Sequence, residues 1–240
     1  MTTAGPLTIG FMSPTTRTRP HFAGFLRIVP SDVTIAFGEL GLVRTSLTDL
    51  ADRMDAILAT TAAGVRDGGW DAVIVPGAPV ELQNAGLPER LAGVLSVPFT
   101  TALGAAADAL RALLARDVLV MTPFDAAMNA LLTAHLSAAG FNAACAELGF
   151  SNENEAVEIG PAAVFDMARG AVKAAGRIDA VYFQGAVLDP LPIIDEMERE
   201  FGVPVIASNP TMLWSILSKL GRSYRIEGSG RLLAEWPVAG

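Results

Sequence analysis

The sequence predicts an α/β fold of two similar lobes, each a parallel sheet flanked by helices. Short apolar runs alternate with longer helical stretches along the 240 residues, which is typical of consecutive βαβ units. A segment of the first half, 70–78 (WDAVIVPGA), is repeated in the second half at 178–186 (IDAVYFQGA). No tract rich in Pro, Gly or Ser separates the halves. We therefore expect a first lobe of 1–115 with a C-terminal return over 208–240, packed closely against a second lobe of 116–207.

Apolar runs mark the strands of the first half. We expect them at 7–12, 32–37, 71–76 and 98–101. The stretch 47–67 predicts a helix that ends at the following Gly-Gly pair, since glycine commonly terminates helices. Ala and Leu fill 102–115, which predicts a second helix. Glu81 and Gln83 are expected on a loop between these elements.

The second half repeats this plan. Strands are expected at 117–122, 179–184 and 203–207, and 141–148 leads into a loop through a strand or edge segment. Helices are expected at 123–139, 161–175, 193–201 and 211–220. Parallel sheets bind ligands at the carboxyl ends of their strands, so the facing strand ends of the two lobes would form the site.

Composition limits the class of function. The chain is 51% hydrophobic and 18% charged with one cysteine, which excludes a disordered tail and a disulfide scaffold. With 25 acidic and 17 basic residues the net charge is −8, which disfavours nucleic acid and anionic membranes. No apolar run approaches the roughly 18 residues of a membrane-spanning helix, and the first residues lack the regions of a signal peptide. We expect a cytoplasmic protein with neither kind of partner.

Several motifs together point to a known family. The two Asp-Ala-Val repeats end at Ala78 and Gly185, and the segments 9–18 (IGFMSPTTRT), 121–129 (MTPFDAAMN) and 202–210 (GVPVIASNP) flank them. This pattern resembles the aspartate/glutamate racemase superfamily, in the branch of arylmalonate decarboxylase and maleate cis-trans isomerase. The resemblance covers nearly the whole chain. It implies a pseudo-symmetric two-lobe fold, a site at the lobe interface, a small carboxylate substrate and no cofactor.

The chain departs from that family where the family carries its chemistry. The two catalytic cysteines of the family align with Ala78 and Gly185, neither of which can transfer a proton. The hydroxyl residues that follow the first cysteine become Pro79 and Val80, and the tyrosine of the Thr-Pro-Tyr segment becomes Phe124. The resemblance therefore implies a mechanism without cysteine. Gly185 and Ala78 would contribute room and backbone N–H donors.

Thr15, Thr16 and Arg17 are the candidate carboxylate-binding group. They follow the first strand, and Arg17 stands where maleate isomerases have an asparagine. A guanidinium offers a bidentate fork to a carboxylate, and the two hydroxyls would add donors. The alternative is an ordinary turn with a solvated arginine.

Further binding candidates lie at other strand ends. Thr122 and Phe124 flank Pro123 at a strand-to-helix junction, where backbone amides could receive an oxyanion. Gln184 precedes Gly185 at the matching end in the second half. Asn152 or Asn154 would be the substrate-binding asparagine that the resemblance implies, and the spacing does not choose between them. Ser208 is either a donor or a helix cap.

Glu39 is the candidate for proton transfer. If it points inward, burial would raise its pKa; the alternative is a surface turn. Glu153 and Glu155 are either general bases or solvated charges ahead of a helix. Cys145 is expected to be a small core residue, and no His/Cys/Asp cluster has metal-ligand spacing.

These observations favour a cofactor-free lyase or isomerase, like arylmalonate decarboxylase or maleate isomerase, that acts on a small carboxylate by cysteine-independent proton transfer. Two alternatives stay open. One is a catalytically altered paralogue that only binds a carboxylate, and the other is a hydrolase or hydratase with a carboxylate-activated water. The sequence allows a homo-oligomer without showing an interface.

Overall fold

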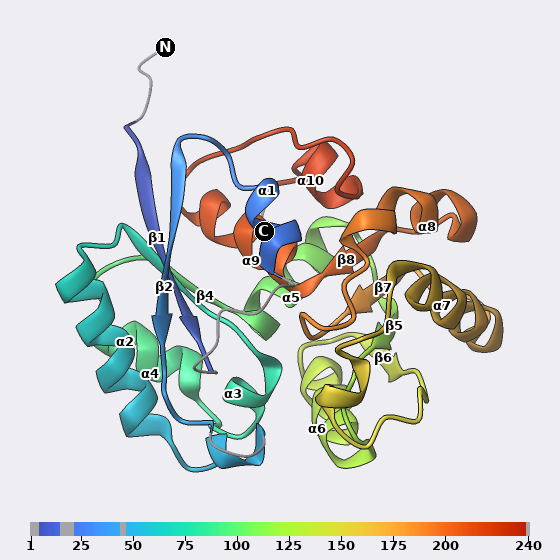
Figure 1. Cartoon of the computed structure of the whole chain (residues 1–240), viewed down its shortest axis with the longest axis horizontal. Helices are drawn as coiled ribbons and strands as arrows, with labels where there is room; N and C mark the ends of the chain where they lie inside the picture. Colours follow the sequence, from blue (N-terminus) through green and yellow to red (C-terminus); the bar gives the residue numbers. More distant parts are fainter. Residues whose placement is uncertain (1–4, 15–21, 44–46, 239–240) are drawn as a thin grey trace.

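Two four-stranded parallel sheets form the centre of the protein (Figure 1). The computed structural model describes residues 5–14, 22–43 and 47–238. The first sheet has the order β2-β1-β3-β4 and the second β6-β5-β7-β8, so both follow one topology. The strands of the first are β1 (Leu7–Ser13), β2 (Val33–Glu39), β3 (Ala72–Val75) and β4 (Phe99–Thr101). Those of the second are β5 (Asp117–Met121), β6 (Asn142–Cys145), β7 (Ala180–Phe183) and β8 (Val205–Ala207). The predicted fold class is confirmed.

Helices flank both sheets. Those of the first half are α1 (Phe22–Arg27), α2 (Met54–Gly68), α3 (Ala78–Leu82), α4 (Leu87–Val94) and α5 (Ala102–Ala112). Those that follow are α6 (Ala126–Ala138), α7 (Pro161–Ala175), α8 (Ile194–Phe201), α9 (Ser208–Lys219) and α10 (Arg231–Glu235). The described residues also form three short 3₁₀ turns: η1 (Leu47–Leu50), η2 (Glu153–Ala156) and η3 (Leu191–Ile193).

Several predicted boundaries are wrong, each for a local reason. The segment after β3 is helix α3, so the loop expected around Glu81 is wrong; Gly77, at φ 92°, turns the chain into this helix. The helix expected at 47–67 is split into η1 and α2. The helix expected at 123–139 begins three residues later because Asp125 caps it, with its carboxylate accepting from the Met128 N–H at 2.8 Å.

The sequence repeat corresponds to a repeated anchor. Asp71 Oδ2 accepts the backbone N–H of Thr8 at 2.7 Å, before β3 and at the start of β1. In the second half Asp179 Oδ2 accepts the N–H groups of Arg116 and Asp117 at 3.0 and 2.9 Å. Each aspartate therefore ties the third strand of its half to the first, and the two halves share a hydrogen-bonding scheme as well as a topology.

Trp70 fixes how α2 lies on the first sheet. A Cβ at Gly10 of β1 would lie 1.9 Å from the Trp70 ring, and one at Gly64 of α2 would lie 2.9 Å from it. No side chain fits at either position, because the indole occupies the space between strand and helix. These glycines are therefore required for close packing rather than for a turn.

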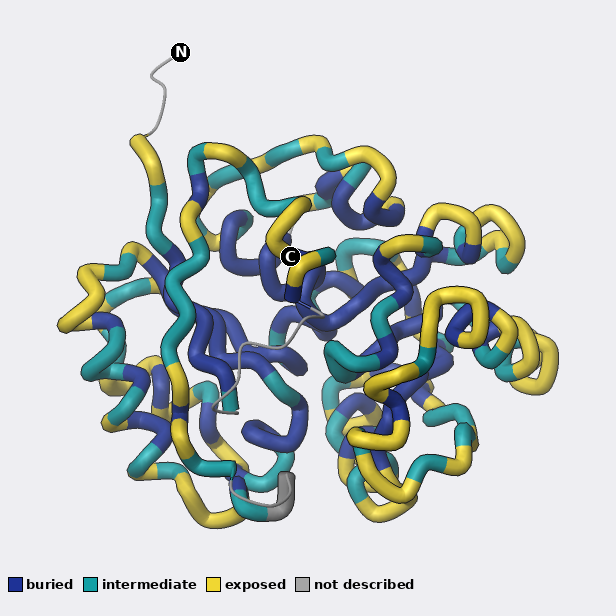
Figure 2. The backbone as a smooth tube through the Cα atoms, in the orientation of Figure 1, coloured by how far each residue is buried: buried dark blue, intermediate teal, exposed yellow. Residues whose placement is uncertain are grey.

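Helix α9 joins the two halves. It follows β8 of the second sheet but packs against α5 and β4 of the first. All residues from Ser208 to Leu217 are buried (Figure 2), and Ser215 Oγ lies 3.0 Å from Thr100 Oγ1 of β4. The core of the first sheet is thus completed by a helix from the C-terminal part of the chain.

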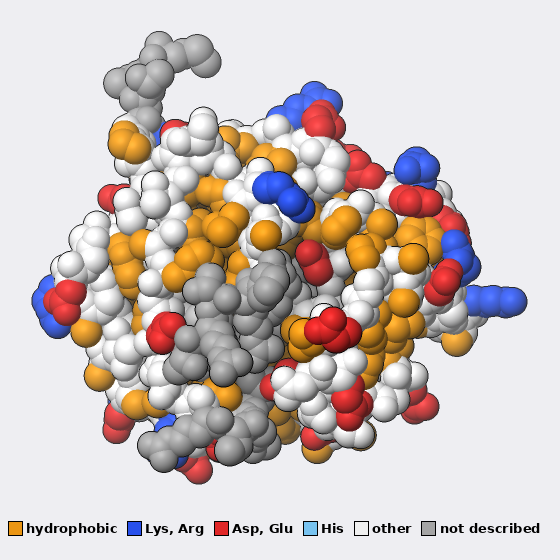
Figure 3. Space-filling model, viewed as in Figure 1, with side chains coloured by type: hydrophobic (Ala, Val, Ile, Leu, Met, Phe, Trp, Pro, Cys, Tyr) orange, Lys and Arg blue, Asp and Glu red, His pale blue; other side chains and the backbone are white. Residues whose placement is uncertain are grey.

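The outer surface is mixed in charge. On the face seen in Figure 3, the Lys and Arg side chains of the described residues are scattered and lie apart from one another among acidic and neutral side chains. In the described ranges, no helix is both long and apolar enough to cross a membrane.

Candidate functional site

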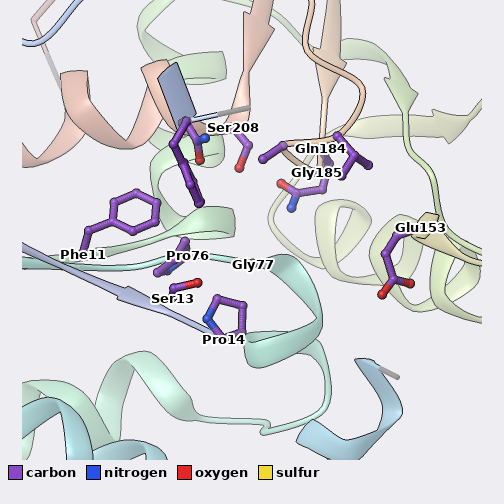
Figure 4. Close-up of a pocket in the computed structure, with 13 residues that line it drawn as sticks. Phe11, Ser13, Pro14, Pro76, Gly77, Glu153, Gln184, Gly185 and Ser208 are labelled. Atoms are coloured by element: carbon purple, nitrogen blue, oxygen red, sulfur yellow. The ribbon is translucent and has the colours of Figure 1, made fainter. Parts of the chain in front are cut away.

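A pocket of about 110 Å³ lies between the carboxyl ends of the two sheets (Figure 4). Ser13 and Pro14 at the end of β1 and Pro76 and Gly77 after β3 line it from the first half. From the second half come the residues after β7 and β8 together with Glu153 of η2. The pocket therefore lies where strand ends of both halves meet, as the repeat predicts.

The pocket wall combines apolar surface with neutral polar groups. Its apolar members are Phe11, Phe22, Pro14, Pro76, Ala186 and Val187. Its polar members Ser13, Gln184, Ser208 and Asn209 are all at most 8% exposed. Glu153, half-buried, is the ionisable side chain among the described lining residues, and none of these residues is a cysteine.

A buried hydrogen-bond chain lies behind this wall. The Tyr182 hydroxyl donates to Gln184 Oε1, and the Ser208 hydroxyl lies within hydrogen-bonding reach of the same phenol. Burial raises the pKa of Tyr182 far above its ordinary value, and the charge of Glu81 raises it further. The phenol therefore stays protonated at neutral pH and remains a donor.

Of the predicted site residues, the pocket brings together Gln184, Gly185, Ser208 and Glu153. Gly185 has φ 107°, and a Cβ there would lie 3.0 Å from Pro123 Cδ. Both the backbone and the proline ring therefore disfavour any side chain at this position, including the cysteine expected from the resemblance.

Ala78, Pro79 and Val80 form the start of α3 and are buried. Ala78 and Val80 pack into two different apolar clusters. None of the three belongs to the described lining of the pocket. These residues follow β3 close to the pocket, but their side chains are part of the core.

Thr122 and Phe124 lie beside the second sheet in a local network. Thr122 Oγ1 donates to Asn129 Oδ1 at 2.5 Å, and the Phe124 N–H donates to Thr122 Oγ1 at 3.3 Å. The Asn129 amide donates in turn to the Phe124 carbonyl at 3.2 Å. The Phe124 amide considered for an oxyanion thus already has a partner within the turn, and neither Thr122 nor Phe124 is among the described lining residues.

Three other candidates are exposed and are not among the described lining residues. Glu39 ends β2 and is exposed, so the burial required by the proton-transfer interpretation is absent. Asn152 and Asn154 are exposed, and Asn152 Oδ1 accepts the Asn154 N–H at 3.0 Å. Glu153 between them is the residue of this turn that lines the pocket.

Thr15, Thr16 and Arg17 lie outside the described residues. They follow directly after Pro14, which lines the pocket. The sequence interpretation of these three residues therefore stays a prediction.

Ser208, for which the sequence left two interpretations, lines the pocket and makes no side-chain cap to α9; its role as a donor to a ligand stays a prediction. Other lining residues had no specific prediction. Phe11, Ser13, Phe22 and Asn209 were not singled out. Ser13 and Asn209 follow predicted strands, and that position was the available signal. The aromatic residues carry no polar signal and are typical of ordinary core.

Cys145 lies on β6, away from the pocket. Thr133 Oγ1 donates to its sulfur at 3.5 Å, and burial raises the pKa of the thiol. A thiol held in its protonated form at an outer strand is a poor nucleophile. Among the described residues, no group of three His, Cys, Asp or Glu side chains could hold a metal ion.

The paired parallel sheets and the pocket between their strand ends define a two-lobed protein of the aspartate/glutamate racemase type. The chain belongs to the arylmalonate decarboxylase family, whose profile matches residues 30–233. Arylmalonate decarboxylase of Bordetella bronchiseptica is 30% identical over 154 residues, which are 63% of this chain and 64% of that protein. Maleate isomerase of Nocardia farcinica (strain IFM 10152) is 28% identical over 183 residues, 75% of this chain and 70% of that protein.

Solved structures agree with these sequence matches. A crystal structure of arylmalonate decarboxylase superposes with a TM-score of 0.79 at 25% identity, covering 95% of this chain and 99% of that one. The maleate isomerase Iso from Pseudomonas putida S16 superposes with a TM-score of 0.82 at 20% identity, covering 96% and 99%. The second match shows the shared fold. The two relatives found by sequence are a decarboxylase and an isomerase.

Proposed function

We propose that this protein is a lyase or isomerase that acts on a small carboxylate without a cofactor and without cysteine. The observation that carries this proposal is the pocket at the facing strand ends, with neutral hydrogen-bonding groups, apolar walls, one carboxylate and no thiol among its described lining residues. Membership of the arylmalonate decarboxylase family supports the carboxylate substrate.

Uncharged hydrogen-bond donors of the pocket wall would contribute to carboxylate binding. The amide nitrogens of Gln184 and Asn209 are such donor groups at the wall. We propose that Arg17, with Thr15 and Thr16, adds a charged fork from the segment after Pro14. A fork of this kind fixes the orientation of a carboxylate as well as its charge.

The pocket suits decarboxylation of an arylmalonate-like substrate. The bond between the α-carbon and one carboxylate breaks, CO₂ leaves, and the electron pair passes into the remaining carboxylate as an enediolate. Apolar surface from Phe11 and Phe22 would disfavour the charged carboxylate relative to neutral CO₂. Donors on the remaining carboxylate would stabilise the developing charge.

The α-carbon must then receive a proton. Glu153 lines the pocket, whereas the exposed Glu39 does not. We therefore assign this step to the carboxylic acid of Glu153 or to a water that Glu153 holds. A hydrolase or hydratase would use the same carboxylate to activate water.

The second candidate is a protein that binds the carboxylate without converting it. The lack of a thiol at the described wall favours it, because the family's cysteine positions are filled by Ala78 and Gly185. Turnover separates the two candidates.

The experiment is proton NMR in D₂O with phenylmalonate, alkylmalonates, maleate and 2-arylpropionates. Wild type is compared with Arg17→Ala and Glu153→Gln, and with Glu155→Gln as the matched control. Glu155 is exposed, and its carboxylate accepts from the Ser151 N–H and the Asn152 amide.

We expect deuterium at the α-carbon of the product with wild type and Glu155→Gln, and roughly a hundredfold loss or more with the other two variants. Line broadening of the ligand without conversion would support the binding protein. Turnover that survives both Arg17→Ala and Glu153→Gln would overturn the assigned roles.

A further inference from the structure

We propose that Tyr182 is a positioning residue: its hydroxyl holds the side chain of Gln184 so that the amide nitrogen faces the pocket as a donor to the ligand. The inference rests on the proposed carboxylate function and specifies which atom would contact that carboxylate. Neither residue belongs to the sequence positions from which catalytic cysteines have been lost.

Strand geometry explains why these two side chains meet. Tyr182 and Gln184 are two residues apart at the end of β7, so their side chains point to the same side. Tyr182 packs in the core shared with α9, whereas Val181 and Phe183 pack in the other cluster of the second half. The phenol therefore lies directly behind the residue that lines the pocket.

The two ends of the Gln184 amide have different environments. Oε1 accepts from the Tyr182 hydroxyl, and Nε2 donates to no residue in the described parts of the chain. Gln184 is only 1% exposed, and its Nε2 is not among the buried side-chain atoms without a partner, so the little surface that this donor keeps lies at the pocket that Gln184 lines. Figure 4 shows the side chain extending into the pocket. A buried amide with its oxygen occupied and its nitrogen free is suited to an anionic oxygen of a ligand.

Proton counting shows what this orientation requires of its neighbours. A phenol has one proton to donate, and Tyr182 gives it to Gln184, so the nearby Ser208 hydroxyl must donate to the phenol oxygen. The opposite amide orientation would place Oε1 in the pocket, where it would repel a carboxylate. Burial also raises the pKa of Tyr182, so the donor does not ionise near neutral pH.

The sequence provides a direct spectroscopic test. The chain has two glutamines, Gln83 and Gln184, and two tyrosines, Tyr182 and Tyr224. Protein labelled with ¹⁵N in the glutamine side chains gives two amide NH₂ signals. Gln83, whose Nε2 donates to the Pro79 carbonyl at 3.1 Å, is the internal reference. Spectra are recorded for wild type, Tyr182→Phe and Tyr224→Phe without ligand, and with phenylmalonate after Glu153→Gln, whose amide gives a third signal, has been added to each so that the ligand is not turned over.

Without ligand, Tyr182→Phe should shift the Gln184 signals and speed their exchange with solvent, leaving Gln83 unchanged. With phenylmalonate, it should weaken binding about tenfold. Tyr224, whose hydroxyl donates to Asp32 at 2.9 Å, should affect neither glutamine. Urea unfolding establishes that each variant is folded.

Different results would overturn the positioning role of Tyr182 and the carboxylate-binding function. If Gln184 signals without ligand are the same in wild type and Tyr182→Phe, the positioning role is overturned whatever binds. If those signals shift but no carboxylate perturbs Gln184 in wild type, the positioning contact stands and the carboxylate function fails. Unchanged phenylmalonate affinity in Tyr182→Phe, with clear binding to wild type, overturns the role in recognition.

Discussion

Glu81 of α3 and His135 of α6 face each other across the boundary between the two halves, with 3.9 Å between Oε1 and Nε2. The glutamate side chain is 7% exposed and the imidazole 36%, so the pair has one inner and one outer member. Burial raises the pKa of Glu81, and the Thr101 hydroxyl and His135 lower it by less. The interaction with His135 therefore does not fully offset the cost of burying the charge of Glu81.

Glu81→Gln should become more stabilising as pH rises. When folding raises the pKa of a carboxyl, protonation of that group favours the folded state. This contribution to stability is complete below the pKa of the unfolded chain, and it is lost as the pH rises through the pKa of the folded protein. Glutamine does not ionise and so has no charge to bury. The free energy of unfolding of the variant should therefore rise by on the order of 1 kcal/mol relative to wild type between about pH 4 and pH 8. Urea unfolding at both pH values measures the gain.

Glu89→Gln is the matched control for this prediction. Glu89 lines the same surface recess as Glu81 and His135 but is exposed. The charge of Glu89 is the smallest of the contributions to the pKa of Glu81, so its replacement should change the pH dependence far less than Glu81→Gln does. A gain for Glu81→Gln that is the same at both pH values would contradict the assignment.

Cys145→Ala should leave turnover within about twofold of wild type, because the thiol lies on β6 rather than at the pocket. Iodoacetamide should likewise fail to inhibit. Since Cys145 is the sole cysteine of the chain, this variant contains no thiol. Loss of turnover with normal folding would place the thiol in the mechanism.

Gly185→Ala should destabilise the protein by about 2–3 kcal/mol, through its positive φ and the contact with Pro123. Gly202→Ala separates the two causes, because Gly202 has φ 71° and an added Cβ there would meet no described atom within 4 Å. We expect about 1 kcal/mol there. Equal losses at the two positions, measured by urea unfolding, would show that Pro123 imposes no extra cost.

Asp179→Asn should lower the urea midpoint at about pH 7, and the difference from wild type should shrink as the pH falls below about 4. The backbone N–H groups of Asp117 and Arg116 lower the pKa of Asp179. When folding lowers the pKa of a carboxyl, its ionised form stabilises the folded state. This stability is fully present above the pKa of the unfolded chain, about 3.9, and it is lost as the pH falls through the pKa of the folded protein. A midpoint difference that persists undiminished at the acidic pH would mean that the charge is not what these amides recognise.

The fold was predictable because its signals are local. Apolar runs such as 71–76 and the repeated Asp-Ala-Val segment mark strands whatever surrounds them. Helix α3 was missed because its five residues begin with Ala-Pro after a glycine, which has the composition of a loop. Its helical state depends on the packing of Ala78 and Val80, which is a tertiary effect.

The site was predictable at the level of strand ends and less so for single residues. Gln184 and Gly185 were identified because the repeat marks the end of β7. Whether Asn152, Glu153 or Asn154 faces inward depends on the rotation of a short 3₁₀ turn, which sequence spacing does not determine. Phe11 and Phe22 enter the pocket only because strand ends of both halves converge there.

The position of α9 has a consequence for how the chain folds. The first sheet is translated early, but the helix that covers it is made only after the whole second sheet. Until α9 leaves the ribosome, the apolar sides of α5 and β4 lack this cover, while the strands of the second half can pair as they emerge. The half synthesised first is thus the half completed last, and during synthesis it is the one exposed to chaperones and to aggregation.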